Sequence, residues 1–416
     1  MPSGATRYFN GVVSRFSQGA RSPQGTQYHA EVVPSHWFLT RNADSRIFQQ
    51  LSVPDIVSRI LAATQAQSSF QLTDTHFARN YCVQYRESDF NFASRLMEDE
   101  GIFYFFQHSA GHHTLVAADS PQAQPALGTF VFDRTGGNTQ DRIFDWLKAQ
   151  ELRAGLVTLA DFEFELPGAP IEATATIPDS VQAGQVTHIL KLAGNDHLEL
   201  YDYPAGWAQR FDGVDPRGGD QSGSLRNIFP AAQQTASIRM GAEAERSVVI
   251  TGGSTAAAFS PGNTFSMQGH FNGDGSYLLT EVTHTATPLG TGFEYTNEFT
   301  CIPAGVPFRP VRSTPKPVLP GTQTAVVVGP AGDEIFTDKY GRVKVQFHWD
   351  REGKNDENSS CWIRVAQPIG GTGGGFFWLP ELGDEVIVAF EEGDPDRPLI
   401  VGRVYNASDA PRRPPP

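Results

Sequence analysis

Three side chains that could do acid–base chemistry lie close together in the stretch YGRVKVQFHWDREG, residues 340–353. His348, Asp350 and Glu352 alternate, so they would share one face of an extended strand. The residues after Trp349 form a polar run, however, which predicts a loop and ends the strand near Trp349. No nucleophile or oxyanion-stabilising element accompanies them in the sequence. We therefore interpret the stretch as a structural strand and not as half of an active site.

The alternation of apolar and polar residues is the stronger signal in this stretch. One face of the strand would carry Val343, Val345, Phe347 and Trp349, and the other Arg342, Lys344, Gln346, His348 and Asp350. Such a strand covers a core with its apolar face. Trp349 is large enough to anchor a core or an interface.

Three other features could bind ligands, and the structural interpretation is stronger for each. His112 and His113 are adjacent, so on a strand they point to opposite faces and cannot hold one metal ion together. Residues 370–375 are glycine-rich but lack the lysine and helix of a phosphate-binding loop, which favours a flexible connection. The acidic residues of 391–396 surround Pro395, which is typical of a solvated turn. We predict no catalytic, metal-binding or cofactor-binding residues.

The charge of the chain excludes one class of partner. The formal net charge is −14, and residues 331–405 alone carry 14 acidic and 8 basic side chains. Small β-barrels often bind single-stranded nucleic acid, but this surface would repel phosphates, so no nucleic-acid partner is expected. No apolar run approaches the roughly 18–20 residues that cross a bilayer, and the first residues lack the apolar core of a secretory signal. Three widely spaced cysteines predict buried free thiols in a protein made in the cytoplasm.

The elements that position these residues are mostly strands. Glycine (41 residues) and proline (29 residues) are abundant, and short apolar runs such as FEFEL, HILKL, SVVIT and YLLTEVTHTA alternate with turns. This rhythm predicts a mainly β fold with a few short helices. One helix is expected after Ser52, with Asp55 in capping-box position, and another from Ser88 to Gly101. A third is expected near residues 230–246.

The last quarter of the chain is a separate unit. Six prolines between Cys301 and Thr322 predict an extended connector. The module that follows has about 80 residues, with predicted strands TAVVV, GRVKVQFHW, CWIRVAQ, FFWLP, EVIVAFEE and LIVGRVYN. Five or six short strands in that length indicate a small closed barrel.

These residues resemble a known family. DKYGRVKVQFHWDREGKNDENSSCWIRVAQ and GFFWLPELGDEVIVAFEEGDPDRPLIVGRVYN are similar to the OB-fold of VgrG proteins, the spike proteins of bacterial type VI secretion systems. SRIFQQLSVPDIVSRIL and YRESDFNFASRLMEDEGIFYFF resemble the family's hub region. The resemblance covers nearly the whole chain. It implies phage-hub-like β-barrel domains followed by a small OB-fold barrel, divided as follows: 1–125, a partial first hub barrel with inserted helices; 126–302, a second hub β-barrel; 303–322, the connector; 323–406, an OB-fold neck; 407–416, a tail.

The resemblance also implies a function. Family members form homotrimers related to the hub and needle of contractile phage tails. Their expected partners are an Hcp-like tube protein and the baseplate, with a PAAR-like tip and effectors carried on a β-helical needle. Sheath contraction would drive the trimer from the cytoplasm into the target envelope, without catalysis, cofactors or stable membrane insertion. The segment RYFNGVVSRFSQ resembles the interior of the first barrel, and RVYNASDAPRRPPP stops where the needle would begin.

On this basis Arg342, Lys344 and Trp349 are the expected residues of the trimer and neck interface, with the two cations pairing between subunits. Two alternatives stay open. A tail hub of a contractile phage or a related injection system has the same architecture. A cell-wall hydrolase is disfavoured, because eleven residues after Tyr405 leave no room in this chain for a lysozyme domain.

Overall fold

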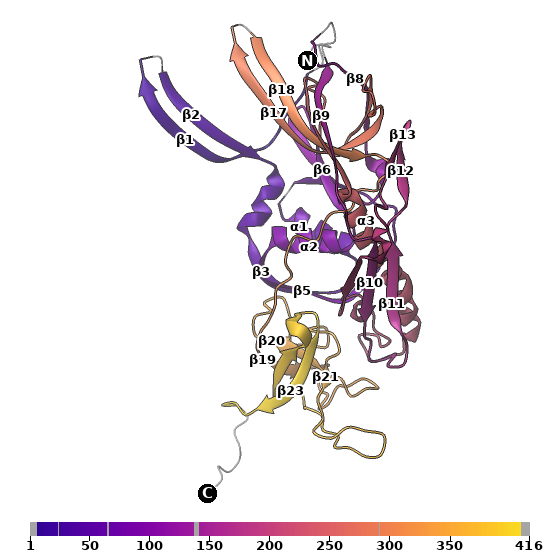
Figure 1. Ribbon diagram of the computed structural model, residues 1–416. Helices are drawn as coiled ribbons and strands as arrows, with labels where there is room; N and C mark the ends of the chain where they lie inside the picture. The colour runs from indigo at the N-terminus through magenta and orange to yellow at the C-terminus, as the bar shows by residue number, and fades with distance from the viewer. Residues whose placement is uncertain (1–5, 24, 65, 137–140, 291, 409–416) are drawn as a thin grey trace.

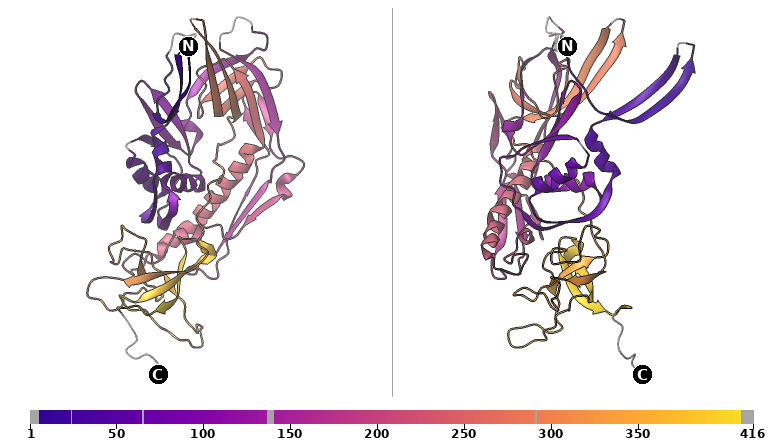
Figure 2. Two further views of the ribbon diagram at one scale, coloured as in Figure 1. Left: turned by 90° about the vertical axis from the view of Figure 1, so that its left-hand side faces the viewer. Right: turned by 180° about the vertical axis from the view of Figure 1, so that it is seen from behind.

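The chain forms two bodies joined by an extended segment. A computed structural model describes residues 6–23, 25–64, 66–136, 141–290 and 292–408. Below, residues 6–303 are called the hub region, residues 304–322 the connector and residues 323–406 the neck. Figure 1 shows the neck in yellow below the hub region, and Figure 2 shows the same arrangement from two further sides. The predicted fold class, mainly β with a few short helices, is confirmed.

The first part of the hub region packs two helices against small sheets. Its elements are β1 (Val12–Ser22), β2 (Gly25–Val33), η1 (Ser35–Arg41), β3 (Ala43–Leu51), α1 (Val53–Ala62), β4 (Gln67–Gln71), β5 (Arg79–Ser88), α2 (Asp89–Asp99), β6 (Phe103–Ser109) and β7 (His112–Ala118). Ser52 caps α1 and Asp55 completes the capping box, as predicted. Ser88 caps α2, and Gly101 follows it with a φ of 67°. The local signals at both helices were therefore correct.

A closed barrel forms the second part of the hub region. Within the described residues its strands, in order around the barrel, are β15 (Val248–Ser254), β18 (Gly292–Pro303), β17 (Gly275–Leu289), β16 (Thr264–Gln268), β8 (Ala126–Phe132) and β9 (Arg142–Gln150). Aromatic side chains fill its interior. The ring of Phe265 lies 4.8 Å from Phe259, 5.8 Å from Tyr277 and 5.9 Å from Phe299, measured between centroids.

A second sheet lies beside the barrel. It consists of β11 (Ile171–Thr176), β10 (Leu156–Asp161) and β14 (Glu199–Asp202), with α3 (Ile228–Arg246) packed on it and the hairpin β12 (Ser180–Ala183) and β13 (Val186–Ile189) nearby. Helix α3 confirms the helix predicted near residues 230–246. The predicted strand FEFEL, residues 162–166, is wrong because the chain turns there. Asp161, directly before that turn, accepts hydrogen bonds from the backbone amides of residues 206–208.

The neck is a five-stranded sheet among the residues described. Its strand order is β20 (Lys344–Phe347), β19 (Gln323–Val328), β22 (Glu385–Phe390), β23 (Pro398–Val404) and β21 (Arg364–Val365). A β-bridge between Val343 and Ile363 brings the two edges together. Two expected strands differ from the structure: FFWLP forms none, and CWIRVAQ contributes only the two residues of β21.

Strand β20 is buried on both faces, which the alternating pattern did not predict. Lys344 lies on the polar side of the alternation, and its Nζ donates to the carbonyl oxygen of Glu357 at 2.6 Å. The Gln346 amide donates to the carbonyl oxygen of Asp350 at 3.1 Å. The loop of residues 350–360 therefore folds back over the polar face and satisfies its side chains.

Two hairpins extend from the hub region as arms (Figure 1). Arm A is β1 with β2, residues 12–33, and forms a two-stranded sheet of its own. Arm B is the far end of β17 and β18, residues 285–296, beyond the last residues that pair with β15 and β16. Phe16 on arm A is 65% exposed and Phe293 on arm B is 73% exposed. Two-stranded ribbons with exposed apolar side chains are marginally stable alone in water.

The arms carry charges of opposite sign. Arm A has Arg15 and Arg21 and a single acidic residue, Glu31. Arm B carries Glu294, with Glu281 and Glu298 at its base, and β17 and β18 contain no lysine or arginine; all of the charged side chains on both arms are exposed. None of them makes an ion pair within the described part of the chain.

The connector is tied to the end of helix α2. Both oxygens of the Glu98 carboxylate accept hydrogen bonds from the connector. The backbone amides of Ser313 and Thr314 donate to Oε2 at 2.9 Å, and their hydroxyl groups donate to Oε1 at 3.3 and 2.7 Å. Arg312 pairs with Asp99 at 3.0 Å. The proline-rich segment is therefore held at one defined position on the hub region.

Within the described residues no helix is long and apolar enough to cross a membrane, and the three cysteines are free and buried, as predicted.

Replacing Glu98 by alanine removes all four of these hydrogen bonds. We expect Glu98→Ala to lower the free energy of unfolding by about 1–3 kcal/mol, because charge-assisted bonds are lost but the freed groups can reach water. Urea unfolding followed by fluorescence measures the change. Glu172→Ala, at an exposed position on β11, is the matched control. An equal loss in both variants would contradict the role of Glu98.

Candidate functional site: the joint between hub region and neck

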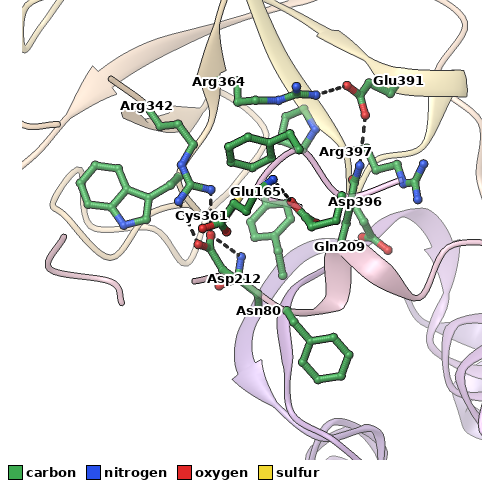
Figure 3. Close-up of a pocket in the computed structure, with 16 residues that line it drawn as sticks. Asn80, Glu165, Gln209, Asp212, Arg342, Cys361, Arg364, Glu391, Asp396 and Arg397 are labelled. Atoms are coloured by element: carbon green, nitrogen blue, oxygen red, sulfur yellow. Dashed lines mark hydrogen bonds and ion pairs between the residues drawn. The ribbon is translucent and has the colours of Figure 1, made fainter. Parts of the chain in front are cut away.

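The neck meets the hub region in a joint that is both polar and buried. The hub side consists of β5, the turn at residues 162–166 and the segment at residues 205–215. The neck side consists of the residues that flank β20 and β21 and the turn at 391–398. A cavity of about 60 Å³ lies between them (Figure 3). The charged side chains that converge here come from segments more than a hundred residues apart.

Arg342 is the central cation of the joint. Its two terminal nitrogens donate to the two oxygens of Asp212 in the hub region, at 2.9 and 2.8 Å, and its Nε donates to Asp338 in the neck at 2.6 Å. The side chain is only 3% exposed. Burial alone would lower the pKa of Arg342, but the hydrogen bonds and charges of Asp212 and Asp338 raise it above its ordinary value. Arg342 therefore stays charged and points its planar fork at the hub region.

A second buried arginine repeats this arrangement. Arg397 of the neck donates to Asp161 Oδ1 of the hub region at 2.9 Å. The other oxygen of Asp161 accepts the backbone amides of residues 206–208, at 2.8–3.0 Å. Nearby, Arg364 pairs with Glu391, and Gln209 of the hub region donates to Glu391 at 3.3 Å. Each carboxylate in this part of the joint has its donors, which a buried ion pair needs to be tolerated.

The acidic turn at residues 391–396 is part of the joint, so the predicted solvated turn is wrong. Lys316 of the connector lies 2.6 Å from both Asp394 and Asp396. Asp396 also accepts the backbone amide of Val83 in β5 at 2.6 Å. Burial alone would raise the pKa of Asp394, but the charge of Lys316 lowers it below its ordinary value. The turn thus joins hub region, connector and neck at one point.

Apolar contacts continue across the joint. Tyr81 and Val83 of β5 belong to the same buried cluster as the core of the neck. The ring of Trp349 lies 5.5 Å from that of Tyr85 of β5, edge to face. Trp362 of the neck donates from Nε1 to the carbonyl oxygen of Asp215 at 2.8 Å. The core of the neck therefore extends onto β5 of the hub region.

The residues expected at the trimer and neck interface lie in different surroundings. Arg342 and Trp349 contact the hub region of their own chain. Lys344 is 1% exposed and lies over the ring of Trp362 at 4.9 Å, and burial lowers its pKa. The pairing of Arg342 and Lys344 between subunits stays a prediction, since the partners described above all belong to the same chain.

The acid–base candidates of the sequence do not converge. His348 is exposed and near Thr324, whereas Asp350 accepts the backbone amides of Glu352 and Gly353 in its own turn. Among the residues that the structure describes, no group of three or more His, Cys, Asp or Glu side chains is arranged to hold a metal ion. His113 accepts a hydrogen bond from the backbone amide of Ser35 at 2.9 Å.

Sequence reasoning missed the hub side of the joint. Asp161 ends β10 and Asp212 lies in a turn-rich segment, and neither belongs to a recognisable motif. The one available signal was the dense charge of EEGDPDRP, residues 391–398, which was interpreted as solvated. Only the three-dimensional packing shows which acidic residue faces which arginine.

Comparison with known families agrees with this two-body arrangement. A model of the phage tail baseplate hub (GPD) matches residues 1–289. The chain belongs to the phage tail baseplate hub family. A second model, of the type VI secretion system/phage-baseplate injector OB domain, matches residues 324–405. In this family's terms, the joint lies where the hub portion meets the OB domain.

The resemblance to VgrG proteins is confirmed by relatives of this hub-family chain. The chain is 40% identical to the type VI secretion system spike protein VgrG1a of Pseudomonas aeruginosa. The match covers 98% of this chain and 61% of VgrG1a. The chain is 38% identical to VgrG1c of the same organism, over 98% of its length and 54% of that protein's. The chain thus spans little more than half the length of these relatives.

Solved structures support the hub fold at low sequence identity. An Escherichia coli component of the type VI secretion system, similar in structure to the T4 bacteriophage tail proteins gp27 and gp5, matches 96% of this chain and 84% of that one. Its TM-score is 0.60 at 22% identity. The lidded Francisella PdpA–VgrG complex matches 95% of this chain and 59% of that one, with a TM-score of 0.53 at 7% identity.

One buried and one exposed arginine–aspartate pair between the neck and the hub region allow a matched test. Arg342→Met leaves Asp212 and Asp338 buried without their cation, so we expect the free energy of unfolding to fall by about 3–5 kcal/mol. Arg351 also joins the neck to the hub region, at 2.9 Å from Asp44, but its side chain is 76% exposed. We expect Arg351→Met to cost less than about 1 kcal/mol. Urea unfolding of both variants measures the difference; equal losses would contradict the central role of Arg342.

Proposed function

We propose that the chain is the hub and neck of a trimeric spike in a type VI secretion system. Its work is mechanical: it transmits the thrust of sheath contraction and delivers effectors. The observation that carries this proposal is the buried joint, which fixes the neck to the hub region through two arginine–aspartate pairs and a shared core. The VgrG spike proteins to which the chain is similar support the same role.

The arms support assembly into a homotrimer. Arm A offers exposed apolar rings and two unpaired arginines, and arm B offers exposed apolar side chains and unpaired glutamates. Arm A of one copy would therefore suit arm B of the next, a head-to-tail contact that closes into a ring. Arg21 and Glu294 lie near the tips of their arms, so they would meet in such a contact. In a ring of three copies, each arm A would contact an arm B of the neighbouring copy.

The remaining partners follow from the resemblance. An Hcp-like tube protein and the baseplate would bind the hub region, and a PAAR-like tip with effectors would bind beyond a needle that continues from the neck. The protein would be made in the cytoplasm and carried out of the cell with the spike. Residues 409–416, within the predicted tail at 407–416, lie outside the described residues.

A second candidate is a tail hub of a contractile phage or a related injection system. The matching family model, which is that of a phage tail baseplate hub, specifically favours it. Neighbouring genes discriminate the two: a sheath with a secretion ATPase supports the secretion system, and capsid genes support the phage.

We propose that the chain has no catalytic activity of its own. The family is one of structural hub and spike proteins, and the acid–base candidates do not converge. A turbidity assay on purified peptidoglycan tests for cell-wall hydrolysis, the enzyme activity that the likeness to phage needles suggests. Clearing by this chain would overturn the proposal.

Light scattering across a dilution series tests the trimer. We expect a mass of about 136 kDa, three times the 45.4 kDa of one chain. Arg15→Glu with Arg21→Glu should reduce assembly, because both arms would then be acidic. Adding Glu294→Lys and Glu298→Lys should restore it. Arg59→Glu with Lys354→Glu, at two exposed sites away from the arms, is the control for net charge. A wild-type mass of 45 kDa at every concentration, or no rescue, would contradict the pairing of the arms.

A further inference from the structure

Three carboxyl groups of the hub region lie together under the neck. Glu163 is buried, and its Oε1 accepts the backbone amide of Glu165 at 3.2 Å. Glu165 Oε1 accepts the backbone amide of Gly213 at 2.8 Å, next to the third carboxyl group, that of Asp212. The first two come from the turn that follows β10, and the third from the segment before η5 (Ser222–Asn227). The close-up in Figure 3 shows Glu165 and Asp212 beside Arg342.

This cluster holds more negative charge than its surroundings can balance. The Glu165 side chain lies within hydrogen-bonding reach of the Asp212 carboxyl group. Its Oε2 is buried and makes no hydrogen bond in the described part of the chain. Two carboxylates this close repel each other unless one of them carries a proton. A proton on Glu165 or Glu163 would remove that repulsion and supply the missing donor.

Among the described residues, the cations that line the cavity beside the cluster come from the neck. Arg342 is shared between Asp212 and the neck's own Asp338. Arg364 and Arg342 stack on the ring of Phe164, but Arg364 is paired with Glu391. Arg397 is paired with Asp161, and Tyr340 lies close to Glu165. In the part of the chain that the structure describes, Glu163 has no ion-pair partner, although the charge of Arg342 partly opposes the rise of the Glu163 pKa. Burial, helped by the nearby Glu165 and Asp212, raises the pKa of Glu163 to about 7, and burial likewise raises that of Glu165.

We propose that docking of the neck onto the hub region takes up a proton at the Glu163–Glu165–Asp212 cluster, so that the joint tightens as the pH falls through neutrality. Undocking exposes the turn at residues 162–166 to water and lets its carboxyl groups ionise freely. The joint is thus a proton-sensitive coupling between the hub region and the neck. This inference concerns a single chain and does not depend on the trimer.

The sign follows from proton linkage. The Glu163 pKa is about 7 in the docked state, against a usual value of 4.5 when the group faces water. The pKa of Glu163 is higher in the docked state than in the undocked state. The free energy that favours docking therefore falls as the pH rises from about 4.5 to about 7, and it is constant above that. Between pH 6 and pH 8 a single group of this kind changes the docking equilibrium about tenfold.

Hydrogen exchange measures docking directly. The amide of Val83 donates to Asp396 of the neck, so peptides that cover β5 should exchange faster when the neck undocks. After correction for intrinsic exchange, we expect protection in β5 to be about tenfold lower at pH 8 than at pH 6. Peptides that cover the paired strands β15 and β18, away from the joint, should be equally protected at both pH values.

The variant Glu163→Gln mimics the protonated group. We expect its β5 protection at pH 8 to remain near the wild-type level at pH 6, while Glu172→Gln, an exposed control, follows the wild type. Equal protection of the wild type at both pH values would overturn the proposal, and so would wild-type pH dependence in a variant that carries both Glu163→Gln and Glu165→Gln. The first result needs no variant, so the test holds even if Glu163→Gln folds poorly.

Discussion

One guanidinium group meets two carboxylates from different parts of the chain, and the position of the neck depends on that contact. Arg342 enters the joint from the neck and is buried between Asp338 of its own body and Asp212 of the other. A buried arginine without partners would cost several kcal/mol, so the undocked arrangement must return Arg342 to water. The geometry of the fork also fixes an orientation, because both terminal nitrogens must reach Asp212 together.

Apolar burial and buried charge do different things in this joint. The core that Tyr81 and Val83 share with the neck brings the two bodies together, since burial of apolar surface is favourable in many orientations. The pairs at Arg342 and Arg397 select one of these orientations, because any other leaves a charge unpaired. Connector contacts at Glu98 and Lys316 then limit how far the neck can move from the hub region.

Local signals in the sequence were enough for the helices and for the class of the fold. The caps at Ser52 and Ser88 depend on neighbouring residues, and the rhythm of turns and apolar runs depends on strand length. The alternation around β20 misled for a physical reason: it predicts an apolar face and a polar face, but not that a later loop covers the polar one. The partners of Arg342 could not be predicted, because 130 residues separate it from Asp212 and many acidic residues were equally plausible.

Under the proposed function, the same contacts would carry axial force between the hub region and the neck. Thrust on the hub region can reach the neck along two routes, the connector and the buried joint. The connector is extended and is held by backbone amides and side chains, so we expect it to resist pulling but to bend under compression. Compression must therefore pass through the joint, where the arginine pairs and the shared core are pressed together. The proposed spike would be pushed from behind, and closely packed contacts yield least under compression.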